Sequence, residues 1–196
     1  MKLTSLAAGL ALAALPITGA AILAQDAPQA PAAPEAPQSP AAPETPQNGE
    51  EMPQPITDPQ QFADSASSSN MFEIQSSQIA LDVSDNPDVL AFAEQMVADH
   101  TAAGDQMTQA AEADGITPAA GLEELHQAQL DELVDLDGEA FDEAYIAAQV
   151  AAHRAAVALF QSFSTDGEDG ALKSFAAETL PTLEQHLEHI LHLSGE

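Results

Sequence analysis

The chain has 196 residues, no cysteine, and a formal net charge of -29 that arises from 32 acidic and 3 basic residues. The lack of cysteine excludes disulfides, thiolate metal sites, iron–sulfur clusters and cysteine nucleophiles. A chain this acidic repels nucleic acid and anionic membranes and attracts cations. The charge therefore argues against a nucleic-acid partner, and it fits either a solubilising surface or weak accumulation of cations.

Residues 1–24 have the pattern of a secretory signal peptide. Lys2 supplies a positive start, residues 6–15 form an apolar run, and Pro16 interrupts it before the small residue Ala24. The same stretch is almost long enough to serve as an uncleaved membrane anchor, but its alanine content and its helix breakers favour cleavage. A lipoprotein anchor would need a cysteine. The sequence thus predicts a periplasmic or secreted protein with no integral membrane domain after cleavage.

Residues 25–58 are built mainly from alanine, proline, glutamine and glutamate, as in APQAPAAPEAPQSPAAPETPQ. Such a composition cannot bury the apolar surface that folding requires, and its prolines favour an extended polyproline conformation. We expect this segment to be a disordered linker in front of a folded domain at residues 59–196.

The folded domain is predicted to be all helical. Aromatic residues make up 4% of the chain and tryptophan is absent, whereas alanine, the strongest helix former, is frequent. Asp58 is expected to cap the first helix, with Pro59 at its first position, and breakers such as Asn86-Pro87 and Asp114-Gly115 separate the later ones. We place the four long helices at about 58–83, 87–113, 138–164 and 171–193. A short helix is expected between about 118 and 136.

The connections between these helices predict their topology. Those between the first and second long helices, and between the third and fourth, are short, which makes two antiparallel hairpins. The connection between the second and third is long and carries the short helix. One long crossover in this place is the arrangement of ferritin-like proteins rather than of a simple up-down bundle. We therefore expect an all-α, ferritin-like four-helix bundle.

Each long helix has a polar residue near its middle, in or beside an apolar seam with spacings of three and four residues. The second, third and fourth long helices place His100, His153 and His186 in the seam. In the first helix, one register turns Glu73 inward and another leaves it on the flank. Midpoints of matched helices fall in one layer, so we expect these side chains to converge at the same depth.

Two interpretations of this layer stay open. Imidazole and carboxylate groups suit zinc, iron, copper or nickel, and bundles commonly build metal sites from facing helices. A hydrogen-bonded network that uses Glu73 or Asp99 would also satisfy the buried histidines without metal. His126 on the short helix, and His189 and His192 on the flank of the fourth long helix, are not expected in the layer.

Four segments carry a further pattern: MFEIQSSQIAL from Met71, FAEQMVADH from Phe92, FDEAYIAAQVAAH from Phe141 and LPTLEQHL from Leu180. Together they resemble the bacterial family labelled domain of unknown function 4142, over about residues 59–193. The resemblance implies a ferritin-like, exported protein, and it brings no established activity. Its motif positions carry over to Glu73, Asp99, His100, His153 and His186.

These five residues are the candidate metal ligands. Two of the helices lack the inward Glu-x-x-His pairs of di-iron ferritins, so a mononuclear, histidine-rich site is the better metal hypothesis. One candidate function is an exported metal-binding protein, for storage, sensing or stress protection, with iron, zinc or copper as its ion. The other is a structural or interaction module with a partner protein in the cell envelope, in which the histidine layer only specifies packing. The sequence shows no catalytic residues and leans against an enzyme.

Overall fold

The structure is a computed structural model that describes residues 55–196. All regular secondary structure in this range is helical: α1 (Pro59–Val83), α2 (Pro87–Ala113), α3 (Glu124–Val134), α4 (Gly138–Asp166) and α5 (Ala171–Ser194). The predicted all-α class is confirmed, and the four long helices begin and end within about two residues of their predicted bounds.

The predicted signal peptide, and the linker up to residue 54, lie outside the described residues and stay predictions. Within residues 55–196, no helix has both the length and the apolar content that are needed to cross a membrane.

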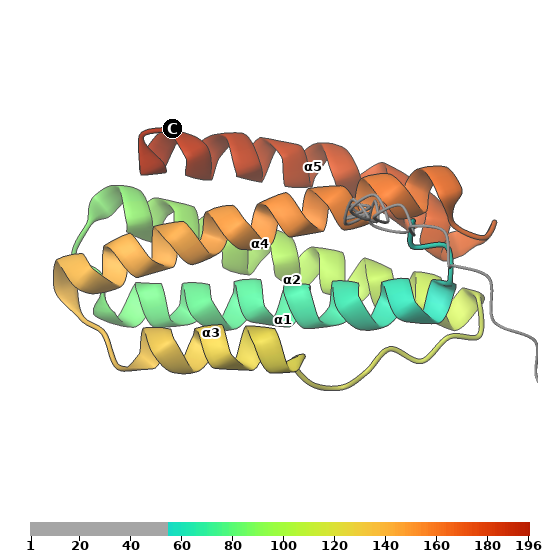
Figure 1. The fold of residues 1–196 in the computed structure, drawn as a ribbon, viewed down its shortest axis with the longest axis horizontal. Helices are drawn as coiled ribbons and strands as arrows, with labels where there is room; N and C mark the ends of the chain where they lie inside the picture. Colours follow the sequence, from blue (N-terminus) through green and yellow to red (C-terminus); the bar gives the residue numbers. More distant parts are fainter. Residues whose placement is uncertain (1–54) are drawn as a thin grey trace, which may run out of the picture. The chain divides into compact units, whose positions relative to one another are not determined.

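The four long helices form a bundle in which α1, α2, α5 and α4 follow one another around the axis (Figure 1). The hairpins α1–α2 and α4–α5 have the most extensive contacts, and α1 also packs on α4, as α2 does on α5. The connection between α2 and α4 returns along α1 and carries α3, so α2 and α4 run in the same direction. The bundle therefore has the ferritin-like topology that the sequence predicts.

The starts of α1 and α2 follow from local sequence. The Asp58 side chain accepts a hydrogen bond from the Gln61 amide (2.8 Å), and the Asn86 side chain accepts one from the Asp88 amide (3.0 Å). In both cases a proline occupies the first turn, where its missing N–H is not needed. These caps explain why the sequence located both helix starts correctly.

The short helix α3 starts at Glu124, later than the sequence suggests, because α1 side chains bind the preceding segment in an extended form. The Ala119 amide donates to Asp64 Oδ1, and the Glu123 amide donates to Ser68 Oγ, both at 2.7 Å. Without these contacts, both amides would donate within a longer helix or to water. The tertiary hydrogen bonds therefore override the local helix preference and hold the crossover on α1.

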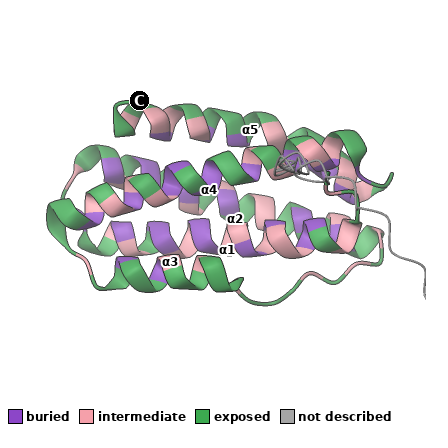
Figure 2. Cartoon of the chain, in the orientation of Figure 1, coloured by how far each residue is buried: buried purple, intermediate pink, exposed green. Residues whose placement is uncertain are grey.

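A polar layer separates two apolar clusters in the bundle interior. One cluster includes Phe72, Phe92 and Tyr145, and the other includes Phe62 and Phe160. Buried positions recur along the facing sides of all four long helices (Figure 2). Between the clusters lie the buried polar side chains Glu73, His100, Gln149, His153 and His186.

The start of α5 is capped by a residue from the other hairpin. Asp114, at the end of α2, accepts hydrogen bonds from the amides of Ala171 and Leu172, both at 2.8 Å. A Cβ at Gly170 would lie 2.6 Å from the Asp114 carboxylate, so a glycine is needed here for close approach. The contact fixes the two hairpins to each other at this end of the bundle.

We expect Asp114→Ala to lower the free energy of unfolding by about 1–2 kcal/mol, the usual effect of losing a helix cap. Urea denaturation of the purified protein measures it. Asp135→Ala is the matched control, because this exposed side chain makes no hydrogen bond among the described residues, and it should change stability by less than about 0.5 kcal/mol. Equal effects of the two substitutions would contradict the capping role.

Candidate metal centre

Three histidines from three different helices meet in the middle of the bundle. His100 of α2, His153 of α4 and His186 of α5 are 6%, 0% and 2% exposed. One ring nitrogen of each lies within 4.8 Å of the others, and the ring centroids are 5.9, 5.6 and 5.6 Å apart. We call these three residues the histidine triad. Within residues 55–196, no other three His, Asp or Glu side chains converge in this way.

Each ring of the triad is held in place by one hydrogen bond to an oxygen that can only accept. The pairs are His100 Nδ1 with Asn70 Oδ1 (3.1 Å), His153 Nδ1 with the Gln149 carbonyl (2.9 Å) and His186 Nε2 with Asp99 Oδ2 (3.0 Å). The ring nitrogen that faces the acceptor must therefore carry the proton. The other nitrogen of each neutral ring is left with a lone pair.

These remaining nitrogens are the feature that needs an explanation. His100 Nε2, His153 Nε2 and His186 Nδ1 are buried and have no hydrogen-bond partner among residues 55–196. A buried acceptor without a partner costs about 1–3 kcal/mol. None of the three can satisfy another, because none carries a proton. A cation between them would use all three lone pairs at once.

Burial favours the neutral form of His100 and His186, which is the form that metal binding requires. Burial, together with charge on His153 and His186, lowers the pKa of His100 to about 3. Burial also lowers the pKa of His186, although its hydrogen bond to Asp99 acts in the opposite direction. Near neutral pH these two rings therefore bind no extra proton.

Glu73 lies beside the triad rather than inside it. Its carboxylate is fully buried, and Oε1 is 3.6 Å from Nδ1 of His153, the nitrogen that points away from the other two rings. Neither carboxylate oxygen has a well-aligned hydrogen bond among the described residues. Burial raises the pKa of Glu73, while charge on His153 and the nearby Gln149 amide lower it. Of the two registers that the sequence allows for α1, the structure therefore has the one that turns Glu73 inward.

Asp99 connects the triad to the surface between α2 and α5. Its side chain is 44% exposed, and its Oδ2 accepts the hydrogen bond from His186. Like Glu73, it contacts the outer side of a triad ring. Of the five candidate ligands, the three histidines lie together in the structure, and the two carboxylates lie around them.

Three other histidines, His126, His189 and His192, lie outside the triad. His126 of α3 bonds Ser68 Oγ (2.6 Å) and stacks on Phe72, with ring centroids 5.4 Å apart. His189 of α5 is half-buried and lies 3.3 Å from the Gln95 amide oxygen. His126 and His189 thus each have a local partner, and His192 is exposed near the end of α5.

Sequence reasoning missed Asn70 and Gly104. A Cβ at Gly104 would lie 2.9 Å from Asn70 Nδ2, so the glycine leaves room for the amide that orients His100. A glycine inside a helix costs up to about 1 kcal/mol relative to alanine, and its position one turn after His100 was a usable signal of close approach. Nothing local in the sequence marks Asn70.

A family model described as "Domain of unknown function (DUF4142)" matches residues 42–193. Two solved structures share the fold at 17% sequence identity. One is the crystal structure of a Streptomyces coelicolor protein labelled DUF305, with a TM-score of 0.56 over 67% of this chain and 88% of that chain. The other is CopM in its Cu(II)-bound form, with a TM-score of 0.59 over 70% of this chain and 96% of that chain. No curated protein matches the sequence.

We expect the metal-free protein to lose stability as the pH falls from about 6.5. His100 takes up a proton near pH 6.5 when unfolded and only near 3 when folded, so the unfolded state binds more protons in this window and acid favours it. Glu73 acts in the opposite direction from its unfolded value of 4.5 up to its raised folded pKa. The His100→Gln variant therefore isolates the first contribution.

Between pH 6.5 and 4.5, the loss of unfolding free energy should be smaller in His100→Gln than in the parent protein by about 2–3 kcal/mol. Urea denaturation at both pH values, with chelator present, measures the difference. The same pH dependence in both proteins would contradict a neutral, buried His100.

Proposed function

The chain belongs to the DUF4142 family of domains of unknown function, and we propose that it binds one transition-metal ion through His100, His153 and His186. The observation that supports this most directly is the set of three buried ring nitrogens without partners, one from each of three helices. Imidazole is the common ligand of zinc, copper, iron and nickel in proteins.

The spacing of the triad is close to that of a bound site. With metal–nitrogen distances of about 2.0–2.1 Å, tetrahedral ligands lie about 3.4 Å apart, and the triad nitrogens already lie within 4.8 Å of one another. Small rotations of the rings close the difference. CopM is similar in fold and has been solved in a Cu(II)-bound form, so copper is the first ion to test, followed by zinc and iron.

The residues around the triad have the properties of outer partners in a metal site. Metal-bound histidines usually donate their second N–H to a carbonyl or carboxylate, which fixes the ring and raises its basicity. Here the oxygens of Asn70, Gln149 and Asp99 accept these hydrogen bonds from the rings. In this proposal Glu73 and Asp99 balance the charge of the ion without binding it directly, and a cation nearby favours the ionised form of Glu73.

The predicted export and the acidic composition are consistent with metal binding outside the cytoplasm. Residues 1–24 predict a periplasmic or secreted protein, and the excess of acidic residues concentrates cations near its surface. Reversible binding of an ion outside the cytoplasm suits storage, sensing or protection against metal stress. The function we propose is the binding itself.

We expect the untagged protein to bind one ion per chain, and each of His100→Gln, His153→Gln and His186→Gln to weaken binding by at least about 100-fold. Losing a ligand should cost more than losing an outer partner, which costs about 10–100-fold. Isothermal titration with Cu(II) and Zn(II), together with elemental analysis, measures both quantities.

His126→Gln and His189→Gln are the matched controls, because both remove a histidine outside the triad. Their affinity should equal that of the parent protein. If the parent stays metal-free after incubation with copper, zinc and iron, the proposal fails and the packing role of the layer is favoured. Equal losses in triad and control variants would indicate adventitious surface binding.

Gly104→Ala should lower the metal affinity by about 10-fold, with only a small net change in the free energy of unfolding. The added Cβ displaces the Asn70 amide from His100 and so costs a hydrogen bond worth about 1 kcal/mol. Alanine in place of glycine stabilises the helix by up to about 1 kcal/mol, which offsets this loss. Metal titration and urea denaturation of the metal-free protein measure the two effects.

Asn70→Ala provides the control for this route. If Gly104 acts only through Asn70, then adding Gly104→Ala to Asn70→Ala should cause no further loss of affinity. Additive losses in the double variant would contradict the role of Asn70.

A further inference from the structure

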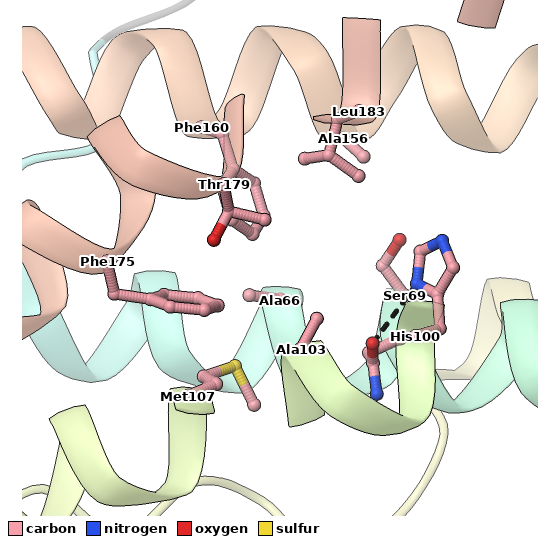
Figure 3. A pocket seen from close by; sticks show the side chains of 11 residues that line it. Ala66, Ser69, His100, Ala103, Met107, Ala156, Phe160, Phe175, Thr179 and Leu183 are labelled. Carbon is pink, nitrogen blue, oxygen red and sulfur yellow. Dashed lines mark hydrogen bonds between the residues drawn. The ribbon is translucent and has the colours of Figure 1, made fainter. Parts of the chain in front are cut away.

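A small cavity lies directly beside the triad, between all four long helices (Figure 3). Its volume is about 30 Å³, which is room for roughly two water molecules. His100 forms part of its wall, and the opposite wall is largely apolar, with Phe160 and Leu183. The cavity is therefore a small pocket that is bordered by one ring of the triad, that of His100.

The cavity lies on one side of the polar layer only. Its wall includes Ala103 and Ala156, each three residues after a triad histidine on the parallel helices α2 and α4, and Leu183, three residues before His186 on the opposed helix α5. All three positions are thus displaced from the layer in the same direction. On the other side, Met96 and Gln149 are fully buried among packed side chains.

A surface groove between α2 and α5 approaches the cavity from solvent. Ala103 and Thr179 line both the groove and the cavity, so only small side chains separate the two. The carboxylates of Asp99 and Glu178 also line the groove. Negative charge at this entrance disfavours anions and admits cations and uncharged molecules.

We propose that an ion in the triad keeps a coordination position open towards this cavity and binds a small uncharged ligand there, in the first instance water. This inference rests on the proposed metal site. Three protein ligands leave at least one position of a four-coordinate ion unfilled, as in metal sites that exchange a ligand. Glu73, Met96 and Gln149 close the other side, so the cavity is the direction in which that position faces.

The test uses the full chain loaded with one Cu(II), whose stoichiometry is measured first. In water enriched in oxygen-17, we expect broadening of the Cu(II) electron paramagnetic resonance lines, which shows a directly bound water. We also expect faster relaxation of bulk water protons, which shows that this water exchanges with solvent.

Three variants test the cavity and its route. Ala103→Leu fills the passage and should reduce the relaxation enhancement roughly threefold or more, since little room for a water remains. Thr179→Ala widens the passage and should increase the enhancement, so the route stays testable if Ala103→Leu does not fold. Ala155→Leu adds the same side chain at an exposed position of α4 and should have no effect.

The outcomes separate this inference from the proposed function. If the protein binds none of copper, zinc and iron, both fail. If one Cu(II) binds and oxygen-17 causes no broadening, the open position is refuted and the metal site stands. If water binds but Ala103→Leu and Thr179→Ala leave the relaxation unchanged, the groove between α2 and α5 is not the route.

Discussion

The burial of several polar groups at the centre of an alanine-rich bundle is the constraint on which the rest of this structure depends. Three imidazoles and a carboxylate are buried here, away from water. A buried polar group without a hydrogen-bond partner destabilises the fold. On the outer side of each ring, an oxygen of Asn70, Gln149 or Asp99 accepts a hydrogen bond from the ring N–H. The second nitrogen of each ring has no partner among the described residues. This difference between the two nitrogens is the physical basis for proposing a metal ion.

The topology of the bundle makes this arrangement possible. The long crossover lets α2 and α4 run in parallel and brings both next to α5, so that one histidine from each reaches the same layer. The helix α1 contributes no ring to the triad, yet its Asn70 and Glu73 contact two of the three rings. The same helix binds the crossover through Asp64 and Ser68. One helix thus supports both the connection and the site.

The two sides of the triad have different chemical environments. One side is packed and carries the buried Glu73, while the other faces a cavity whose entrance is acidic. An ion held at this boundary would be oriented by the packed side and accessible from the open one. The fold shared with CopM and the DUF305 protein shows that this helical scaffold recurs at low identity, whereas the chemistry depends on the side chains each chain places inside it.

The sequence by itself determined the helices and the depth of the histidines, because both depend on local information. Capping residues and breakers fixed the helix ends, and a period of 3.6 residues placed His100, His153 and His186 in apolar seams near helix midpoints. The start of α3 and the register of Glu73 could not be read in this way, since tertiary contacts decide both. The tertiary structure alone also decided which nitrogen of each ring faces inward. That choice depends on partners such as Asn70 for His100 and Asp99 for His186, which are 30 and 87 residues away in the chain, and no local pattern encodes a hydrogen bond over such distances.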